Sequence, residues 1–111
     1  MERLGADAFS KGKLLRSGVW IVAFLAEWCP FCQRFLPEFV ALGRESGLSL
    51  AIGDVTSDES PLWNEFRIGV VPTLVVFQEG EPVMRVDGVL GSGLPSGSLA
   101  KARALALGSN R

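Results

Sequence analysis

The chain contains no histidine and no tyrosine among its 111 residues. The missing histidine excludes Cys-His and Ser-His catalysis, and every zinc site with an imidazole ligand. Only two cysteines are present, Cys29 and Cys32, so a tetrahedral zinc shell would need two carboxylates to complete it. Structural zinc strongly prefers cysteine and histidine ligands. We therefore expect no metal site and no other cofactor.

The sequence also lacks an excess of charge and a long apolar segment. The formal net charge of -1 gives no electrostatic basis for binding nucleic acid or an anionic membrane. The longest apolar run covers residues 19–26, whereas a membrane helix needs roughly 20 residues. Residues 1–18 have no apolar core of the kind found in signal peptides. We expect a soluble, cytoplasmic protein that is a monomer.

Apolar residues make up 48% of the chain, which is typical of a compact globular protein. A length of 111 residues fits a single domain over residues 1–111, with a core that needs no metal or disulfide framework. Continuous apolar runs predict buried strands; the expected strands cover residues 19–25, 48–53, 73–77 and 83–86.

Apolar spacing at three and four residues predicts the helices. We expect them over residues 6–16, from residue 30 to between 43 and 47, in a short stretch opened by residues 60–61, and over 96–107. Pro37 should kink the second helix, and Pro82 marks the last strand as an edge of the sheet. Two βαβ crossovers followed by a hairpin predict an α/β sandwich, in which helices cover both faces of a mixed sheet.

Cys29 and Cys32 are separated by two residues, which lets the two thiols close and reopen a small disulfide ring. In a reducing cytosol this spacing favours a catalytic pair. Cys29 directly precedes a predicted helix, whose free N–H groups and dipole favour its thiolate, the nucleophilic form. Cys32 lies one turn further along and would be the resolving thiol. A static disulfide and an inert buried pair are the alternatives.

The spacing and the predicted helix start together indicate thiol–disulfide exchange. Cys29 would attack a substrate disulfide and form a mixed disulfide with one of its sulfurs. Cys32 would then attack Cys29, release the reduced product and leave a Cys29–Cys32 disulfide.

Two motifs and the elements between them resemble the thioredoxin family along nearly the whole chain. Residues 24–32 (FLAEWCPFC) resemble the active-site segment of the family, and residues 69–73 (GVVPT) resemble the segment that carries its cis-proline. Further matches are Pro37, Phe77, Gly80 and Gly88. The resemblance implies a three-layer α/β/α sandwich with a mixed sheet of four to five strands. Its first edge strand would be minimal or missing, because only residues 1–5 are available for it.

The same resemblance implies a substrate groove around Cys29. Its expected residues are Trp28, Pro30, Phe31, Val71, Pro72 and Gly88. Pro72 would be cis, although a trans proline at a strand start is the alternative, and the backbone of Val71 would pair with an extended substrate. Phe31 fits the groove and the core equally well, and Trp20 and Trp63 are expected to pack in the interior. The implied partners are protein disulfides and an electron donor similar to thioredoxin reductase.

The chain departs from the family at three places that bear on the chemistry. Ala23 and Ile52 occupy the positions of the buried aspartate and lysine of the family, and Pro-Phe between the cysteines is closer to the Pro-Tyr of glutaredoxins. Without the buried carboxylate, we expect a Cys29 that ionises more easily and a less negative reduction potential. The resolving step should be slower or rely on water. Glu27 is expected at the surface, with proton relay as an alternative.

Four functions fit these residues. The first is reduction of protein disulfides by the dithiol, and the second is glutathione-linked exchange, which the Pro-Phe dipeptide favours. The third is a binding module whose thiols only sense the redox state. The fourth is a dimer that binds a cluster through Cys29 of each subunit.

Overall fold

A computed structural model describes residues 1–109 of the chain. Five strands form one mixed sheet in the order β1-β5-β4-β6-β7. They are β1 (Glu2–Leu4), β4 (Val19–Leu25), β5 (Ser49–Asp54), β6 (Thr73–Gln78) and β7 (Glu81–Asp87). Strands β1, β5 and β4 are parallel to one another, and β6 and β7 each run antiparallel to the preceding strand in that order.

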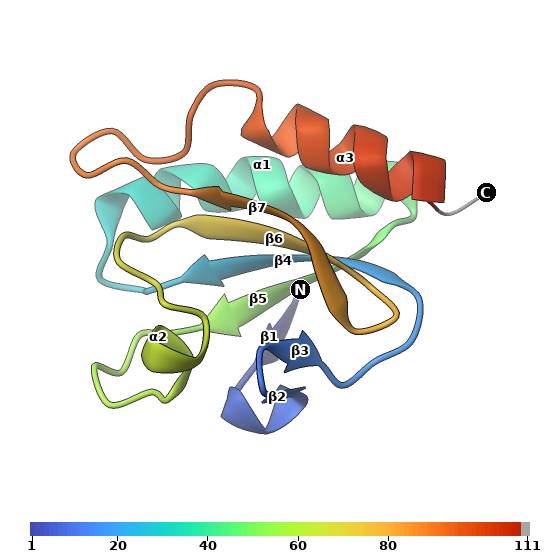
Figure 1. The fold of residues 1–111 in the computed structure, drawn as a ribbon. Coiled ribbons are helices and arrows are strands. Elements are labelled where there is room, and N and C mark those ends of the chain that lie inside the picture. Colours follow the sequence, from blue (N-terminus) through green and yellow to red (C-terminus); the bar gives the residue numbers. More distant parts are fainter. Residues whose placement is uncertain (110–111) are drawn as a thin grey trace.

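Helices cover both faces of this sheet, as the sequence predicts. Helices α1 (Pro30–Ser46) and α3 (Ser98–Ser109) lie together on one face, whereas α2 (Leu62–Glu65) lies on the other (Figure 1). The arrangement is the expected three-layer α/β/α sandwich. No helix within residues 1–109 is long and apolar enough to span a bilayer.

Strand β4 is the centre of the core. Its residues Ile21, Val22, Ala23 and Phe24 are completely buried, because β5 and β6 flank the strand and helices or loops cover both of its faces. A continuous apolar run is the sequence pattern of such a strand. Helix α1 then carries the chain to β5, which pairs parallel with β4, so the first predicted βαβ crossover is confirmed.

The second predicted crossover is wrong. Strand β6 runs antiparallel to β4, so β5, α2 and β6 do not form a βαβ unit. Helix α2 has only four residues, or about 6 Å of helix. It is therefore too short to carry the chain back along the length of the strands. Strand β6 starts at the same end of the sheet at which β5 stops, beside the last residues of β4.

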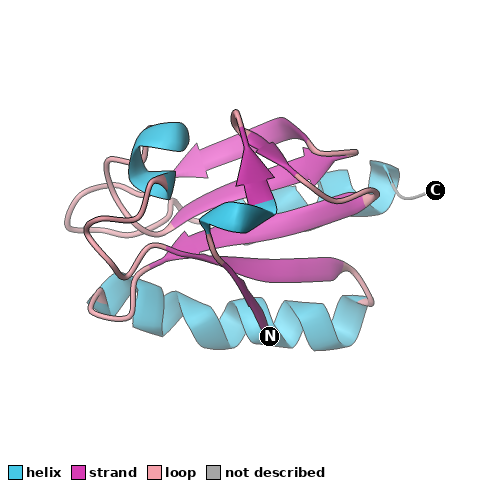
Figure 2. Cartoon of the chain, turned by 90° about the horizontal axis from the view of Figure 1, so that it is seen from below, coloured by secondary structure: helices cyan, strands magenta, loops and turns pink. Residues whose placement is uncertain are grey.

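The predicted helix over residues 6–16 is also wrong. The segment forms a short 3-10 helix η1 (Ala6–Ala8) and a hairpin of β2 (Phe9–Ser10) and β3 (Lys13–Leu14), both in front of the strands in Figure 2. Lys11 and Gly12 connect the two strands with φ values of 52° and 77°. Positive φ at both positions is the geometry of a type I′ turn, and a helix cannot continue through it.

The two edge strands agree with the sequence. Strand β1 is short but present, and it places Arg3 beside Ile52 of β5, which in turn lies beside Ala23 of β4. At the other edge, β7 contains Pro82 near its start. Val76 of β6 pairs with Met84, but the next residue of β6 pairs with Pro82, so a bulge interrupts this edge.

Glycine determines two helix ends. Helix α1 continues past Pro37 and ends at Ser46, as the sequence predicts, because Gly47 has a φ of 69°; a kink at Pro37 stays a prediction. Helix α3 begins at Ser98, two residues after the predicted start, because Gly97 has a φ of 83°.

Candidate active site

Cys29 and Cys32 meet at the start of α1. Cys29 is the N-cap residue and Pro30, which is exposed, is the first residue of the helix. The N–H of Cys32 donates a hydrogen bond to the Cys29 sulfur at 3.4 Å. Both cysteines are free thiols, with exposed fractions of 5% and 2%. The N–H groups of the first turn and the positive end of the helix dipole thus point at the Cys29 sulfur.

Cys32 is a protonated thiol at neutral pH. Burial, and to a smaller extent the neighbouring Cys29 thiol, raises the pKa of Cys32 to about 12, although hydrogen bonding to the backbone of Ala26 opposes this shift. Because a thiol reacts only as its thiolate, any attack by the Cys32 sulfur requires that its proton leave first.

The loop before β6 faces Cys29. The Val71–Pro72 peptide bond is cis, as the resemblance implies, and the Cys29 thiol donates toward the Val71 carbonyl oxygen at 3.6 Å. The hydroxyl of Thr73 donates to the Val70 carbonyl oxygen at 2.7 Å and closes the turn. The site therefore places a fixed main-chain carbonyl next to the exposed side of the thiol.

Gly88 lies directly behind this loop. A Cβ atom at position 88 would lie 2.6 Å from the Pro72 carbonyl oxygen, which is too close for any side chain. The absence of a side chain at Gly88 therefore allows the end of β7 to pack against Pro72. The structure thus brings Val71, Pro72 and Gly88 together with the cysteine pair.

Trp28 borders the thiol and is held in one orientation. Its side chain is 55% exposed, and its indole N–H donates to the Thr56 carbonyl oxygen at 2.8 Å. It also stacks on Trp63 with ring centroids 6.4 Å apart. Trp63 is only half-buried, so the prediction that it packs in the interior holds in part. Its contact with Trp28 depends on the loop after β5, and the sequence contains no signal for it.

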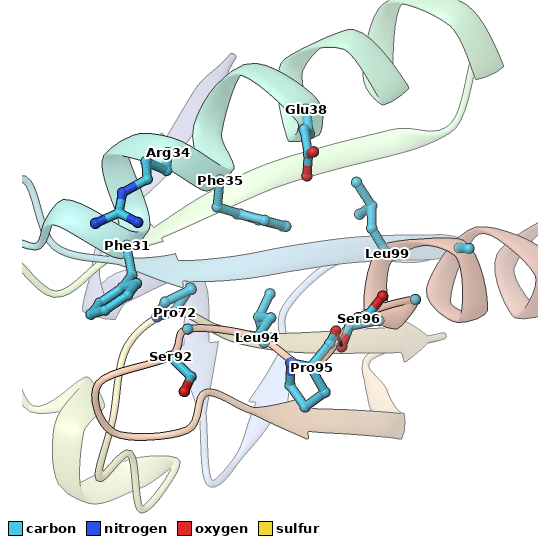
Figure 3. A pocket seen from close by; sticks show the side chains of 14 residues that line it. Phe31, Arg34, Phe35, Glu38, Pro72, Ser92, Leu94, Pro95, Ser96 and Leu99 are labelled. Atoms are coloured by element: carbon cyan, nitrogen blue, oxygen red, sulfur yellow. Dashed lines mark hydrogen bonds between the residues drawn. The ribbon is translucent and has the colours of Figure 1, made fainter.

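Phe31 packs against the edge of the core and also lines a cavity at the surface. It is half-buried and forms one end of a cavity of about 410 Å³ between α1 and the loop that precedes α3 (Figure 3). The guanidinium of Arg34 lies 4.9 Å from the centre of the Phe31 ring. Pro72 also lines this cavity, which therefore borders the cysteine site through Phe31 and Pro72.

The loop over residues 92–97 forms the other wall of this groove, and no expected site residue lies in it. A Cβ at Gly93 would lie 3.3 Å from the Phe31 ring, so the loop packs tightly on that side chain. Gly91, Gly93 and Gly97 all have positive φ. Their density in the sequence was the available signal for a loop with a defined shape.

The region beneath the cysteine pair is apolar. Ala23 and Ile52 are buried, with exposed fractions of 0% and 2%, so no carboxylate or ammonium group occupies either position. Within residues 1–109, no group of three or more His, Cys, Asp or Glu side chains is arranged to hold a metal ion.

Comparisons with known proteins match this geometry. The family model described as thioredoxin matches residues 3–96. A thioredoxin of Mycolicibacterium smegmatis is 33% identical over 88 residues, which cover 77% of this chain and 79% of that protein. A bifunctional thioredoxin reductase/thioredoxin of Mycobacterium leprae is 31% identical over 87 residues, which cover 78% of this chain and 18% of that protein.

A solved structure matches as well. A mutant thioredoxin from Halobacterium salinarum NRC-1 superimposes with a TM-score of 0.66 and 29% sequence identity. The superposition covers 86% of this chain and 77% of that one. The family model spans both the cysteine pair and Pro72.

Proposed function

Because this chain belongs to the thioredoxin family, and is a thiol–disulfide oxidoreductase of that family, we propose that it reduces disulfide bonds of other proteins through Cys29 and Cys32. One observation carries the proposal: Cys29 caps α1, accepts the Cys32 N–H at 3.4 Å, and faces the Val71 carbonyl oxygen at 3.6 Å. A sulfur at this position lies next to the N–H groups of the helix start and to the main chain of the loop before β6.

The proposed reaction has two exchanges. The Cys29 thiolate attacks one sulfur of the substrate disulfide, the substrate S–S bond breaks, and the second substrate sulfur leaves as a thiolate. Cys32 then loses its proton and attacks the Cys29 sulfur, which releases the first substrate sulfur. The substrate gains two electrons and the protein is left with a Cys29–Cys32 disulfide.

The groove supports a substrate in extended conformation. Main-chain groups of Val71 are available to pair with it in the manner of an added strand. Trp28 and Phe31 offer apolar contacts on the two sides of the thiol, and Pro30 stands beside it. Gly88 supports the loop at Pro72 from behind, because its lack of a side chain lets the end of β7 pack against that loop.

The proposed partners follow from the same reaction. An oxidised Cys29–Cys32 pair must be reduced again, and the Mycobacterium leprae relative is by its name a fusion of thioredoxin with thioredoxin reductase. We propose an electron donor of that kind, a cytoplasmic location, where thiols are kept reduced, and a monomeric protein of one domain. Size-exclusion chromatography with light scattering should give the 11.9 kDa of one chain.

Glutathione-linked exchange is a second candidate, and the cavity beside Phe31 favours it. Its volume of about 410 Å³ lies in the range of small-ligand sites, and Phe31 and Pro72 connect it to the cysteine pair. Turnover of a glutathionylated peptide with glutathione as the sole reductant would support this candidate over the first.

Trapping with Cys32→Ser tests the proposed function. The variant should attack disulfides of added insulin or of cellular proteins but should fail to resolve the mixed disulfides that form. Mixed disulfides through Cys29 should therefore accumulate, and dithiothreitol should cleave them. The matched control Cys29→Ser should form none. The unsubstituted chain should also catalyse insulin reduction by dithiothreitol in repeated turnover. Stoichiometric capture without turnover would instead identify a redox-sensing binding module.

A further inference from the structure

A second cavity lies beside Cys32 and shares no residue with the groove at Phe31. It has a volume of about 130 Å³ and is lined by Arg3, Leu25, Ala26, Glu27, Cys32, Gln33 and Leu36. A water molecule occupies about 30 Å³ of liquid and needs two to four polar partners. The cavity is therefore large enough for water, and Arg3, Glu27 and the Cys32 thiol can supply those partners.

Arg3 reaches this cavity because of the register of the sheet. It lies beside Ile52, and Ile52 lies beside Ala23, so these three residues form one row on the face that α1 covers. The two inner positions of the row are apolar and buried. The edge position carries a cation that lines the same cavity as Cys32. Ala23 and Ile52, the inner residues of the row, carry no charge, and Arg3 at the outer end of the row carries a positive charge.

Two carboxylates hold Arg3 at this place. Its guanidinium lies 3.6 Å from Glu27 Oε1 and 3.8 Å from Asp54 Oδ2. Asp54 also accepts hydrogen bonds from the N–H and hydroxyl of Thr56 at 3.0 and 2.6 Å. Burial alone would raise the pKa of Asp54, but the Thr56 hydrogen bonds and the Arg3 charge together lower it. Asp54 is therefore a fixed anion that anchors Arg3.

Glu27 is placed differently from Asp54. Glu27 lines the cavity together with Cys32, and its side chain is 65% exposed to solvent. Its main chain is fixed at both ends, because the Glu27 N–H donates to the Thr56 hydroxyl at 3.0 Å and the Gln33 amide donates to the Glu27 carbonyl oxygen at 2.8 Å. A carboxylate on such a segment can accept a proton that reaches it through water.

Resting on the proposed function, we propose that Arg3 and Glu27 serve the resolving step through this cavity. Water takes the proton of the Cys32 thiol and passes it to the Glu27 carboxylate. The resulting Cys32 thiolate attacks the Cys29 sulfur of the mixed disulfide. The Cys29–substrate bond breaks, and the substrate sulfur leaves with the electron pair and takes a proton from solvent.

Arg3 is a positioning residue in this step, because its guanidinium pairs with Glu27 at the cavity. The Cys29 thiol lies next to the Cys32 sulfur, Glu27 and Arg3 line the cavity beside Cys32, and Asp54 of β5 pairs with Arg3. At high pH, hydroxide can remove the Cys32 proton directly, so the contribution of Glu27 should fade as the pH rises.

Reaction of the reduced protein with 5,5′-dithiobis(2-nitrobenzoate) in stopped flow tests the proposal. The first thionitrobenzoate released reports attack by Cys29, and the second reports resolution by Cys32. We expect Arg3→Gln and Glu27→Gln to leave the first phase unchanged and to slow the second about tenfold near pH 7. The difference should shrink to less than about twofold near pH 10. Arg103→Gln and Glu45→Gln, on exposed helix surfaces, are the matched controls and should change neither phase.

The outcomes separate the two proposals. A normal first phase with an unchanged second phase in Arg3→Gln and Glu27→Gln would overturn the role of this cavity and leave the proposed function intact. A second phase slowed by the same factor at every pH would also overturn it, because a purely structural effect has no reason to fade at high pH. Absence of a first phase in the unsubstituted chain would contradict the proposed function itself.

Discussion

Cys32 connects the redox site to the pH dependence of folding stability. Its pKa in the folded protein, about 12, lies above that of an exposed thiol, about 8.5, so the fold favours the protonated form. This contribution to stability is complete below the unfolded-state pKa and is lost as the pH rises toward the folded-state pKa.

We therefore expect the free energy of unfolding of the reduced protein to fall with pH. Between about pH 8 and pH 10 it should fall by roughly 1 to 2 kcal/mol more than that of Cys32→Ala, which lacks the thiol. Urea unfolding with a phosphine reductant at several pH values measures the difference. Parallel pH profiles for the two proteins would contradict the raised pKa.

Ala23 occupies the position at which the resemblance to the thioredoxin family implies a buried aspartate. The side chain is completely buried beside Ile52, and Arg3 lies two strands away, about 10 Å by the usual strand spacing. An aspartate at position 23 would thus be buried without a cation in contact.

We expect Ala23→Asp to lower the free energy of unfolding by roughly 3 kcal/mol near pH 7. Burial raises the pKa of such a carboxyl group, so the loss should diminish as the pH falls and the group is protonated. Ala23→Asn, of similar size and without the charge, should show no comparable pH dependence. Adding Ile52→Lys should restore part of the stability, and chemical unfolding at pH 4 and pH 7 would detect all three effects.

At the scale of elements, the sheet strands could be predicted and some connections could not. The apolar runs of β4 and β6 are short and rich in β-branched residues, which is the sequence pattern of buried strands. The β2–β3 hairpin was missed because Lys11 is an unusual residue for a positive φ, where Asn or Gly is the common signal. The antiparallel direction of β6 depends on the length of α2, which sequence spacing does not determine.

The end of β7 and the loop at Pro72 depend on each other through Gly88. We expect Gly88→Ala to lower the free energy of unfolding by about 2 kcal/mol, because the new methyl group would meet the Pro72 carbonyl oxygen at 2.6 Å. Insulin reduction should also slow, since the loop must move at the groove. Gly69→Ala is the matched control, because a Cβ there meets no atom within 4 Å. Equal stability of the two variants would contradict the steric account.

At the scale of the whole molecule, one aromatic cluster joins segments that are far apart in the sequence. Phe9 of β2 contacts Phe24 of β4, Phe66 after α2 and Phe77 of β6, with ring centroids 5.7, 5.2 and 6.0 Å away. The cluster lies on the sheet face opposite α1 and covers it where the chain has no long helix.

Phe9→Ala should lower the free energy of unfolding by about 3 to 5 kcal/mol, because it removes the anchor of the hairpin and leaves a cavity. Phe9→Leu should cost less, since it fills most of that space. Thermal and urea unfolding give the stabilities. Amide exchange should show that β2 and β3 lose protection in Phe9→Ala; retained protection with full stability would show that the cluster is not what holds the hairpin.

The sequence predicts the centre of the site better than its surroundings. Cys29, Cys32 and Pro72 belong to short motifs with fixed local geometry, so their meeting could be anticipated from the family resemblance. The cavity at Cys32 depends on the pairing of β1 with β5, which places Arg3 beside Ile52, 49 residues further along the chain, and so next to the start of α1. No local pattern encodes that register, and only the folded sheet reveals it.

The bulged edge at β7 bears on how copies of this protein behave when concentrated. An outer strand exposes unpaired main-chain groups that can recruit a strand from a neighbouring molecule and begin fibre growth. In β7, Pro82 lacks a donor and the bulge beside it breaks the repeat, while Arg85 and Asp87 form an ion pair further along the strand. A foreign strand would find no regular ladder to extend, so this border of the sheet disfavours aggregation.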